Sequence, residues 1–245
     1  IVLGSATPSL ESLRNAQAGR YALLELPERA GAAQLPSVRL LDLRNLAHSN
    51  GLAPPLIEAL RNRIDRKEQS LLFINRRGFA PVLMCHACGW VASCPRCDSR
   101  MTLHKAAGSL RCHHCGSEAP VPVTCPACQG GSLRGLGEGT ERVEAALNRL
   151  FPGARIERID RDSTRRKGLL EEKLERVRSG NADIMVGTQM LAKGHDFPNL
   201  TLVGVLNADQ GLYSYDFRAS EQLFQRIMQV AGRAGRAEKP GEVVI

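Results

Sequence analysis

Four Cys-x-x-Cys pairs lie between residues 85 and 128 and contain all eight cysteines of the 245-residue chain. The pairs are Cys85/Cys88, Cys94/Cys97, Cys112/Cys115 and Cys125/Cys128. A tetrahedral zinc ion binds four thiolates, and two such pairs supply them. The eight cysteines therefore predict two zinc ions, each bound by four cysteines.

A disulfide framework is the alternative interpretation of the same cysteines. No stretch of the chain has the pattern of a signal peptide or a transmembrane segment, so nothing points to an oxidising compartment. Gly89 and Gly116 follow two of the pairs and Asp98 follows a third, and these residue types tolerate the left-handed backbone of a metal-binding turn. Zinc is therefore favoured over disulfides. Four histidines could replace a cysteine ligand but are expected to be bystanders: His86, His104, His113 and His114.

Three ways of sharing the four pairs between two ions are possible. The stretch from Met101 to Arg111 has the pattern of strand, glycine-containing turn and strand, and such a hairpin brings its two flanking pairs together. This favours a nested arrangement. Zinc 1 is then bound by Cys85, Cys88, Cys125 and Cys128, and zinc 2 by Cys94, Cys97, Cys112 and Cys115.

The charge of the chain is compatible with a nucleic-acid partner. It has 33 Lys and Arg against 25 Asp and Glu, a formal net charge of +8 that falls to about +4 with eight thiolates and two zinc ions counted. Aromatic residues make up 4% of the chain, too few for a long platform on which bases stack. No membrane partner is expected.

Apolar stretches alternate with segments of helical spacing on both sides of the cysteines. Strands are expected at 1–4, 21–26, 71–74, 155–160, 183–187, 200–206 and 241–245, and helices after Ser9, at 56–64, 141–150, 169–177 and 218–236. Residues 31–55 look irregular. Alternating strands and helices predict an α/β fold with a parallel sheet covered on both faces. Both ends fall in apolar segments, so we expect the chain to be a piece of a longer protein.

Two segments after the cysteines carry groups suited to phosphate. Gln229, Arg233 and Arg236 are spaced i, i+4 and i+7, so a helix would present them on one face, and guanidinium groups bind two phosphate oxygens at once. A solvated basic helix is the alternative. The second segment, 187–198, follows a strand; its Thr188 could bind a phosphate, and its Asp196 a ribose hydroxyl or an arginine.

The order of these motifs resembles superfamily 2 helicases. Ser5-Ala-Thr7, the strand ending in Arg76-Arg-Gly78, the 187–198 segment and the 229–236 segment resemble motifs III, IV, V and VI of that superfamily. The cysteine block, together with Gly139-Thr-Glu141 and the 158–162 segment, is similar to the PriA family of replication-restart helicases. The resemblance covers the whole chain.

The resemblance implies a RecA-like helicase lobe with a two-zinc insertion. It places the end of lobe 1 at 1–30, the start of lobe 2 at 31–84, the zinc insertion at 85–128 and the rest of lobe 2 at 129–245. It implies an ATP- and Mg²⁺-dependent 3′-to-5′ DNA helicase of the bacterial cytoplasm, acting on forked and single-stranded DNA. The implied partners are single-stranded DNA-binding protein and primosome proteins, including the replicative helicase loader.

The same resemblance implies roles for individual residues. Arg236 would be the arginine finger at the γ-phosphate, with Arg233 and Gln229 beside it. The residues implied to couple or line the DNA and ATP sites are Ser5, Thr7, Gly187, Thr188, Lys193, Gly194, Asp196 and Gly232.

The sequence departs from the helicase pattern in one respect. It contains no Gly-x-x-x-x-Gly-Lys-[Ser/Thr] loop and no Asp-Glu-x-His segment, so we expect the chain alone neither to hydrolyse ATP nor to unwind DNA. A competence-type DNA translocase and a non-catalytic zinc-ribbon module that binds nucleic acid or protein are the alternatives.

Overall fold

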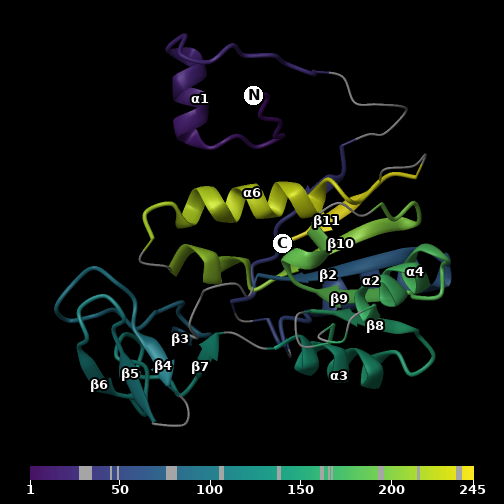
Figure 1. Ribbon diagram of the computed structural model, residues 1–245. Helices are drawn as coiled ribbons and strands as arrows, with labels where there is room; N and C mark the ends of the chain where they lie inside the picture. Colours follow the sequence, from purple (N-terminus) through teal and green to yellow (C-terminus); the bar gives the residue numbers. More distant parts are fainter. Residues whose placement is uncertain are drawn as a thin grey trace.

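The computed structural model describes most of the chain in two sheets with flanking helices (Figure 1). The described residues are 1–27, 35–44, 46–48, 50–75, 82–104, 108–136, 139–160, 163–164, 166, 168–192, 196–213, 216–235 and 239–245.

The larger sheet has six strands, and every neighbouring pair is parallel. Its order is β1-β11-β10-β2-β9-β8. The strands are β1 (Ser37–Arg39), β11 (Glu242–Val244), β10 (Leu200–Leu206), β2 (Gln69–Ile74), β9 (Ile184–Gly187) and β8 (Ile156–Ile159). Every residue of β10, β2 and β9 is buried, as expected for strands covered on both faces.

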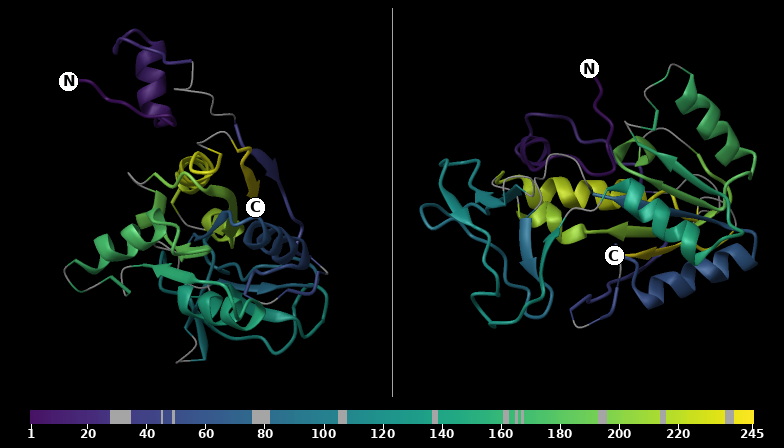
Figure 2. Two further views of the ribbon diagram at one scale, coloured as in Figure 1. Left: turned by 90° about the vertical axis from the view of Figure 1, so that its right-hand side faces the viewer. Right: turned by 90° about the horizontal axis from the view of Figure 1, so that it is seen from below.

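Helices cover both faces of this sheet (Figures 1 and 2). Leu72 and Ile74 of β2 belong to one core with α2 (Pro54–Asp65) and α3 (Thr140–Leu150). Leu71 and Phe73 belong to the other core with α4 (Leu169–Arg178) and α6 (Ala219–Ala231). The alternation follows from the two-residue period of a strand. Two shorter helices, α5 (Gln189–Ala192) and the 3₁₀ helix η1 (Ala208–Tyr213), complete the larger unit.

The smaller sheet is antiparallel and lies beside the larger one (Figure 1). Its order is β6-β5-β4-β3-β7. The strands are β3 (Val82–Cys85), β4 (Thr102–His104), β5 (Ser109–Arg111), β6 (Glu118–Pro120) and β7 (Leu133–Leu136). The chain enters this unit after β2 and leaves it before α3, and β3 pairs with β7 at the junction. The expected insertion at 85–128 lies inside this unit.

The N-terminal region differs from expectation. The strands predicted at 1–4 and 21–26 are wrong, because these residues form irregular chain with exposed apolar side chains such as Ile1, Leu24 and Leu26. A strand needs a neighbour to hydrogen-bond, and the described structure offers none here. The predicted helix is confirmed as α1 (Leu10–Gln17), whose first turn is capped by the Ser9 hydroxyl, 3.2 Å from the Ser12 amide.

The residues at 31–55 contain more structure than predicted. The short strand β1 pairs with β11, and Pro54 opens α2. The C-terminal strand β11 has a partner on each side, β1 and β10. No described helix is both long and apolar enough to cross a membrane.

Candidate metal centres and the carboxyl edge of the sheet

The eight cysteine sulfurs form two groups, each of four atoms lying within 4.8 Å of one another. In the outer group, Cys85 and Cys128 are 3.7 Å apart, and so are Cys88 and Cys125. The inner group joins Cys94, Cys97, Cys112 and Cys115, with cross-pair sulfur distances of 3.5 and 3.6 Å. The structure thus brings together the two nested sets, through the β4–β5 hairpin and the pairing of β3 with β7.

These sulfur distances fit a tetrahedral ion rather than disulfides. Four thiolates bound to zinc at about 2.3 Å lie about 3.8 Å apart, whereas a disulfide requires about 2.0 Å. All eight cysteines are free. Each group can therefore hold a zinc ion, which would cross-link short strands that enclose little apolar core.

Three of the four Cys-x-x-Cys turns share one backbone geometry. In each, the amide of the residue after the second cysteine donates to the carbonyl of the first, from Gly89 to Cys85 and from Gly116 to Cys112 at 2.9 Å. That residue has positive φ: +78° at Gly89, +74° at Gly116 and +59° at Gln129. Asp98, predicted to fill this role, does not have positive φ. Gln129 fills it in the Cys125/Cys128 turn, where no sequence signal marked it.

The turn geometry lowers the pKa of the first cysteine in two of the turns. The backbone N–H of Cys88 donates to the Cys85 sulfur, and this hydrogen bond is the largest cause that lowers the Cys85 pKa to about 7. The Cys112 pKa is likewise lowered, first by a backbone hydrogen bond from Cys115. Metals bind the thiolate form, so these two lowered pKa values favour metal binding. Backbone hydrogen bonds also act to lower the Cys88 and Cys115 pKa values, but burial and hydrogen bonds to the other cysteines outweigh them and raise both to about 12.

Substitutions at the positive-φ positions should change stability in opposite directions. Gly116→Ala should destabilise the zinc unit by about 1 kcal/mol, because alanine disfavours left-handed backbone while open space surrounds the new Cβ. Gln129→Gly should stabilise it by about 0.5–1 kcal/mol for the same reason. Thermal unfolding of the zinc-loaded chain measures both. A destabilising effect of Gln129→Gly would contradict the assignment of backbone strain there.

Several candidate residues lie at the carboxyl edge of the larger sheet, where its parallel strands end. Gly187 ends β9, and Thr188 follows it, partly buried, with its carbonyl accepting from the Leu191 amide at 3.0 Å. A Cβ at Gly187 would lie 2.4 Å from the Ile159 carbonyl oxygen. Gly187 thus allows close packing of β9 and β8. Asp196 is exposed and directly precedes Phe197, which is buried in the core.

The prediction that one helix face carries both Gln229 and Arg233 is wrong. Helix α6 ends at Ala231, so Gln229 lies on the helix and Arg233 in the turn that follows. The chain leaves the helix because Gly235 has φ +69° and its amide donates to the Leu200 carbonyl at 3.1 Å. Gly232 is the C-cap residue. Arg236, Lys193 and Gly194, like Arg76-Arg-Gly78, lie outside the described residues.

Gln229 lines a polar pocket that the sequence did not predict. The pocket has a volume of about 220 Å³ and is lined by Gln189, Gln222, Gln225, Arg226 and Gln229. Arg226 donates to the Asn75 side-chain oxygen at 3.2 Å and to Gln222 at 3.3 Å. Asn75 is buried and directly follows β2. The spacing of 222, 225, 226 and 229 on one helix face was the available signal.

Ser5 and Thr7 lie in the irregular chain before α1, with the Thr7 amide donating to the Ser5 hydroxyl at 3.1 Å. Helix α1 contacts the start of α6: the Leu10 amide donates to Glu221 at 3.0 Å, and Glu11 pairs with Arg218. Figure 1 shows α1 and the N-terminus on the α6 side of the sheet.

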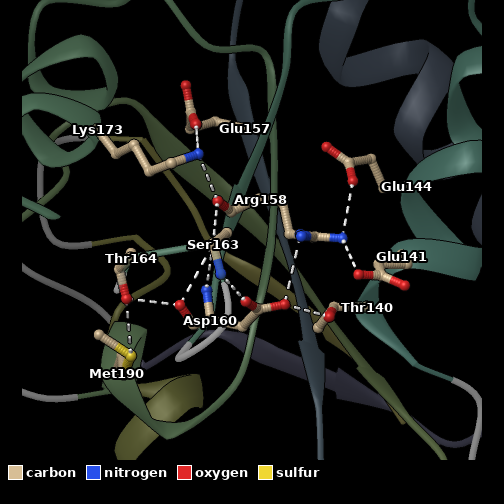
Figure 3. Close-up of polar contacts among 10 residues, drawn as sticks. All are labelled: Thr140, Glu141, Glu144, Glu157, Arg158, Asp160, Ser163, Thr164, Lys173 and Met190. Atoms are coloured by element: carbon tan, nitrogen blue, oxygen red, sulfur yellow. Dashed lines mark hydrogen bonds and ion pairs between the residues drawn. The ribbon is translucent and has the colours of Figure 1, made fainter. Parts of the chain in front are cut away.

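A buried polar network joins α3, the end of β8 and α5 (Figure 3). The Asp160 carboxylate accepts from the Thr140 hydroxyl and from the Ser163 amide at 2.7 Å, and it pairs with Arg158 at 3.4 Å. The Thr164 hydroxyl donates to the Asp160 carbonyl at 2.6 Å. Burial raises the Asp160 pKa, but the hydrogen bonds and Arg158 outweigh it and hold the pKa below its usual value.

Loss of the Thr140 hydroxyl should weaken this network. Thr140 is 1% exposed, so Thr140→Val keeps its shape and removes a hydrogen bond to a buried carboxylate, at a cost of about 1.5–3 kcal/mol. The Asp160 pKa should rise. Because its folded pKa is lowered, Asp160 stabilises the fold above its unfolded pKa and loses this effect as pH falls, so acid unfolding should begin at higher pH.

The control for this prediction is Thr164→Val, which removes a hydrogen bond to a neutral carbonyl. It should cost about 0.5–1.5 kcal/mol and leave the acid transition unchanged. Chemical unfolding across a pH series measures both variants. Equal acid transitions in the two variants would show that Thr140 does not set the Asp160 pKa.

Known proteins match this arrangement along the whole chain. The model of the PriA DNA helicase Cys-rich region matches residues 94–120, and that of the helicase conserved C-terminal domain matches 136–238. The replication restart protein PriA of Haemophilus influenzae is 52% identical over 245 residues, covering 100% of this chain and 34% of that protein. Its Bacillus subtilis counterpart is 50% identical over 248 residues, covering 100% and 31%.

The chain thus spans about a third of the length of these curated relatives. Its larger unit is a RecA-like helicase lobe, and its smaller unit carries the cysteines. Two four-cysteine groups on a sheet inserted into a helicase lobe, together with identity at this level from end to end, show that the chain belongs to the PriA family of replication restart proteins.

Proposed function

We propose that this chain is the second motor lobe and the zinc insertion of an ATP-dependent 3′-to-5′ DNA helicase that restarts stalled replication forks and initiates primosome assembly. The observation that most directly supports this proposal is the position of the cysteine unit in the chain. It is inserted between β2 and α3, and the six-stranded helicase sheet remains continuous. We assign residues 1–30 to the end of lobe 1, 31–84 and 129–245 to lobe 2, and 85–128 to the zinc insertion.

The carboxyl edge of the sheet supports a site for phosphate groups. Parallel strands gather ligand-binding residues at this edge, and Thr188 contributes a hydroxyl there, directly after β9. Gln229 contributes an amide to the pocket that it shares with Gln189. We assign Arg236 as the arginine finger, with Arg233 and Gln229 beside it. The residues assigned to couple ATP hydrolysis to DNA are Ser5, Thr7, Gly187, Thr188, Lys193, Gly194, Asp196 and Gly232.

The cofactors follow from the donors present. The two four-sulfur groups fit two zinc ions, with Cys85, Cys88, Cys125 and Cys128 as ligands of zinc 1 and the other four cysteines as ligands of zinc 2. ATP with Mg²⁺ would be bound mainly by a lobe with a phosphate-binding loop, which this sequence does not contain. The arginines of this lobe would stabilise negative charge on the transferred phosphate.

We further propose a bacterial cytoplasmic location at the replication fork. The ligands would be forked and single-stranded DNA. The protein partners would be single-stranded DNA-binding protein and primosome proteins, including the replicative helicase loader. A competence-type translocase or a non-catalytic zinc-ribbon module is the competing function, and the identity along both units favours the restart helicase over both.

The test compares this chain with a longer protein that joins it to its phosphate-loop lobe. The longer protein should hydrolyse ATP in the presence of DNA and unwind duplexes with a 3′ single-stranded tail, while this chain alone should do neither. Arg236→Ala in the longer protein should lose ATP hydrolysis and keep two zinc ions.

Arg218→Ala is the matched control, because Arg218 lies at the N-cap of α6 and pairs with Glu11 at the surface. It should retain ATP hydrolysis. Normal ATP hydrolysis by Arg236→Ala would contradict the arginine-finger assignment. ATP hydrolysis by this chain alone would contradict the proposal that a separate lobe with a phosphate-binding loop is required.

A further inference from the structure

We propose that His104 and His113 form a third metal site, separate from the two cysteine groups, that binds a divalent transition-metal ion of the Zn²⁺, Ni²⁺ or Cu²⁺ class. The two rings face each other on the smaller sheet, with their Nε2 atoms 3.2 Å apart. The ring centroids are 5.3 Å apart, and the ring planes are tilted by 43°.

The nitrogen separation fits two imidazoles on one ion. Imidazole nitrogens bind zinc at about 2.0–2.1 Å, which places two such ligands about 3.3 Å apart in a tetrahedron and about 2.9 Å apart as neighbours in an octahedron. The observed 3.2 Å lies between these values. Imidazole is also a preferred ligand of these ions.

The fold holds both rings in place from different elements. His104 ends β4 and pairs in register with Ser109 of β5. His113 directly follows Cys112, whose amide donates to the Ser117 carbonyl at 2.8 Å and whose sulfur belongs to the inner group. Two anchored ligands lose less conformational entropy on binding an ion than two free side chains do.

The site is open to solvent, which distinguishes it from the cysteine groups. His113 is exposed and His104 partly exposed, so water can complete the coordination sphere. Neither ring belongs to a four-sulfur group. A hydrogen bond between two exposed histidines contributes little to stability, because water competes for both rings. An exchangeable ion is therefore the stronger reason for this geometry, and it would bind more weakly than zinc in the cysteine sites.

The experiment titrates zinc-loaded chain with Ni²⁺ by calorimetry while metal analysis follows zinc content. The wild type should bind Ni²⁺ at the His104/His113 pair and retain two zinc ions. His104→Gln should lose the Ni²⁺ site and retain both zinc ions. His114→Gln is the matched control, because His114 is exposed and belongs to the same turn as His113 without being part of the pair. It should bind Ni²⁺ like the wild type.

Three results would overturn the proposal: no Ni²⁺ binding by the wild type, undiminished binding by His104→Gln, or loss of a zinc ion in His104→Gln. The last would show that the ring supports the inner cysteine site instead. Selective broadening of the His104 and His113 ring signals by Ni²⁺ in NMR spectra would locate the ion directly.

Discussion

Removing two cysteines from the same group should lower the zinc content from two ions per chain to one, whereas removing one from each group should remove both. Cys94→Ala with Cys112→Ala deletes two ligands of the inner group only. Cys85→Ala with Cys94→Ala leaves each group with three ligands. Only the nested grouping predicts one retained zinc ion in the Cys94/Cys112 variant, since both other pairings would assign Cys94 and Cys112 to different ions.

The structural effect should be large and confined to the smaller sheet. Its core consists of a few residues, among them Leu103, Leu110 and the two buried cysteines Cys94 and Cys112. Strands of three or four residues with so little core depend on the metal, and structural zinc contributes about 10–16 kcal/mol of apparent binding free energy in small zinc domains. Loss of the inner ion should therefore unfold β4, β5 and β6.

The larger sheet should survive this loss. Its two cores lie on the faces of β2, β9 and β10 and include none of the cysteines. Zinc analysis and hydrogen exchange on the two double variants measure the prediction, with exchange rising in 94–120 and staying low in β2 and β10. One retained zinc ion in the Cys85/Cys94 variant would contradict the grouping, and rapid exchange in β2 would show that the two units unfold together.

Local patterns in the sequence predict much of this fold. The apolar runs at 71–74, 183–187 and 200–206 became the central strands, because a strand buried on both faces must be apolar throughout. The hairpin expected between Cys97 and Cys112 predicted the cysteine grouping, because it brings its two flanking cysteine pairs together. Both features depend on residues that are close in sequence, and tertiary contacts reinforce them.

The missed features depend on contacts that a sequence pattern does not contain. Residues 1–4 have the composition of a strand but no neighbouring strand in the described structure. The end of α6 is set by the approach of the 232–235 turn to the chain before β11, not by helix propensity. The pocket beside Gln229 and the Asp160 network likewise join residues that lie far apart in sequence.

The approach of the 232–235 turn to the chain before β11 leaves no room for a side chain at Gly235. Gly235→Ala should destabilise the larger unit by about 3 kcal/mol or more, combining left-handed strain with a backbone clash. Its φ is +69°, and a Cβ would lie 2.6 Å from the Gly241 amide nitrogen. Neither of these two segments can move freely, because Gly235 is hydrogen-bonded to Leu200 and Gly241 leads into β11. The expected fall in melting temperature is about 6–12 °C.

Gly232→Ala is the stability control from the same motif. Gly232 has φ −65°, which alanine adopts readily. A Cβ at this position would have the Met228 carbonyl oxygen as its nearest neighbour, 3.3 Å away. Its effect should stay within about 1 kcal/mol. Arg233 lies between the two glycines, so a shift forced at Gly235 moves the guanidinium as well as β11. A melting temperature of Gly235→Ala equal to that of the wild type would contradict this prediction. It would show that the close contact between Gly235 and Gly241 fixes neither β11 nor the position of Arg233.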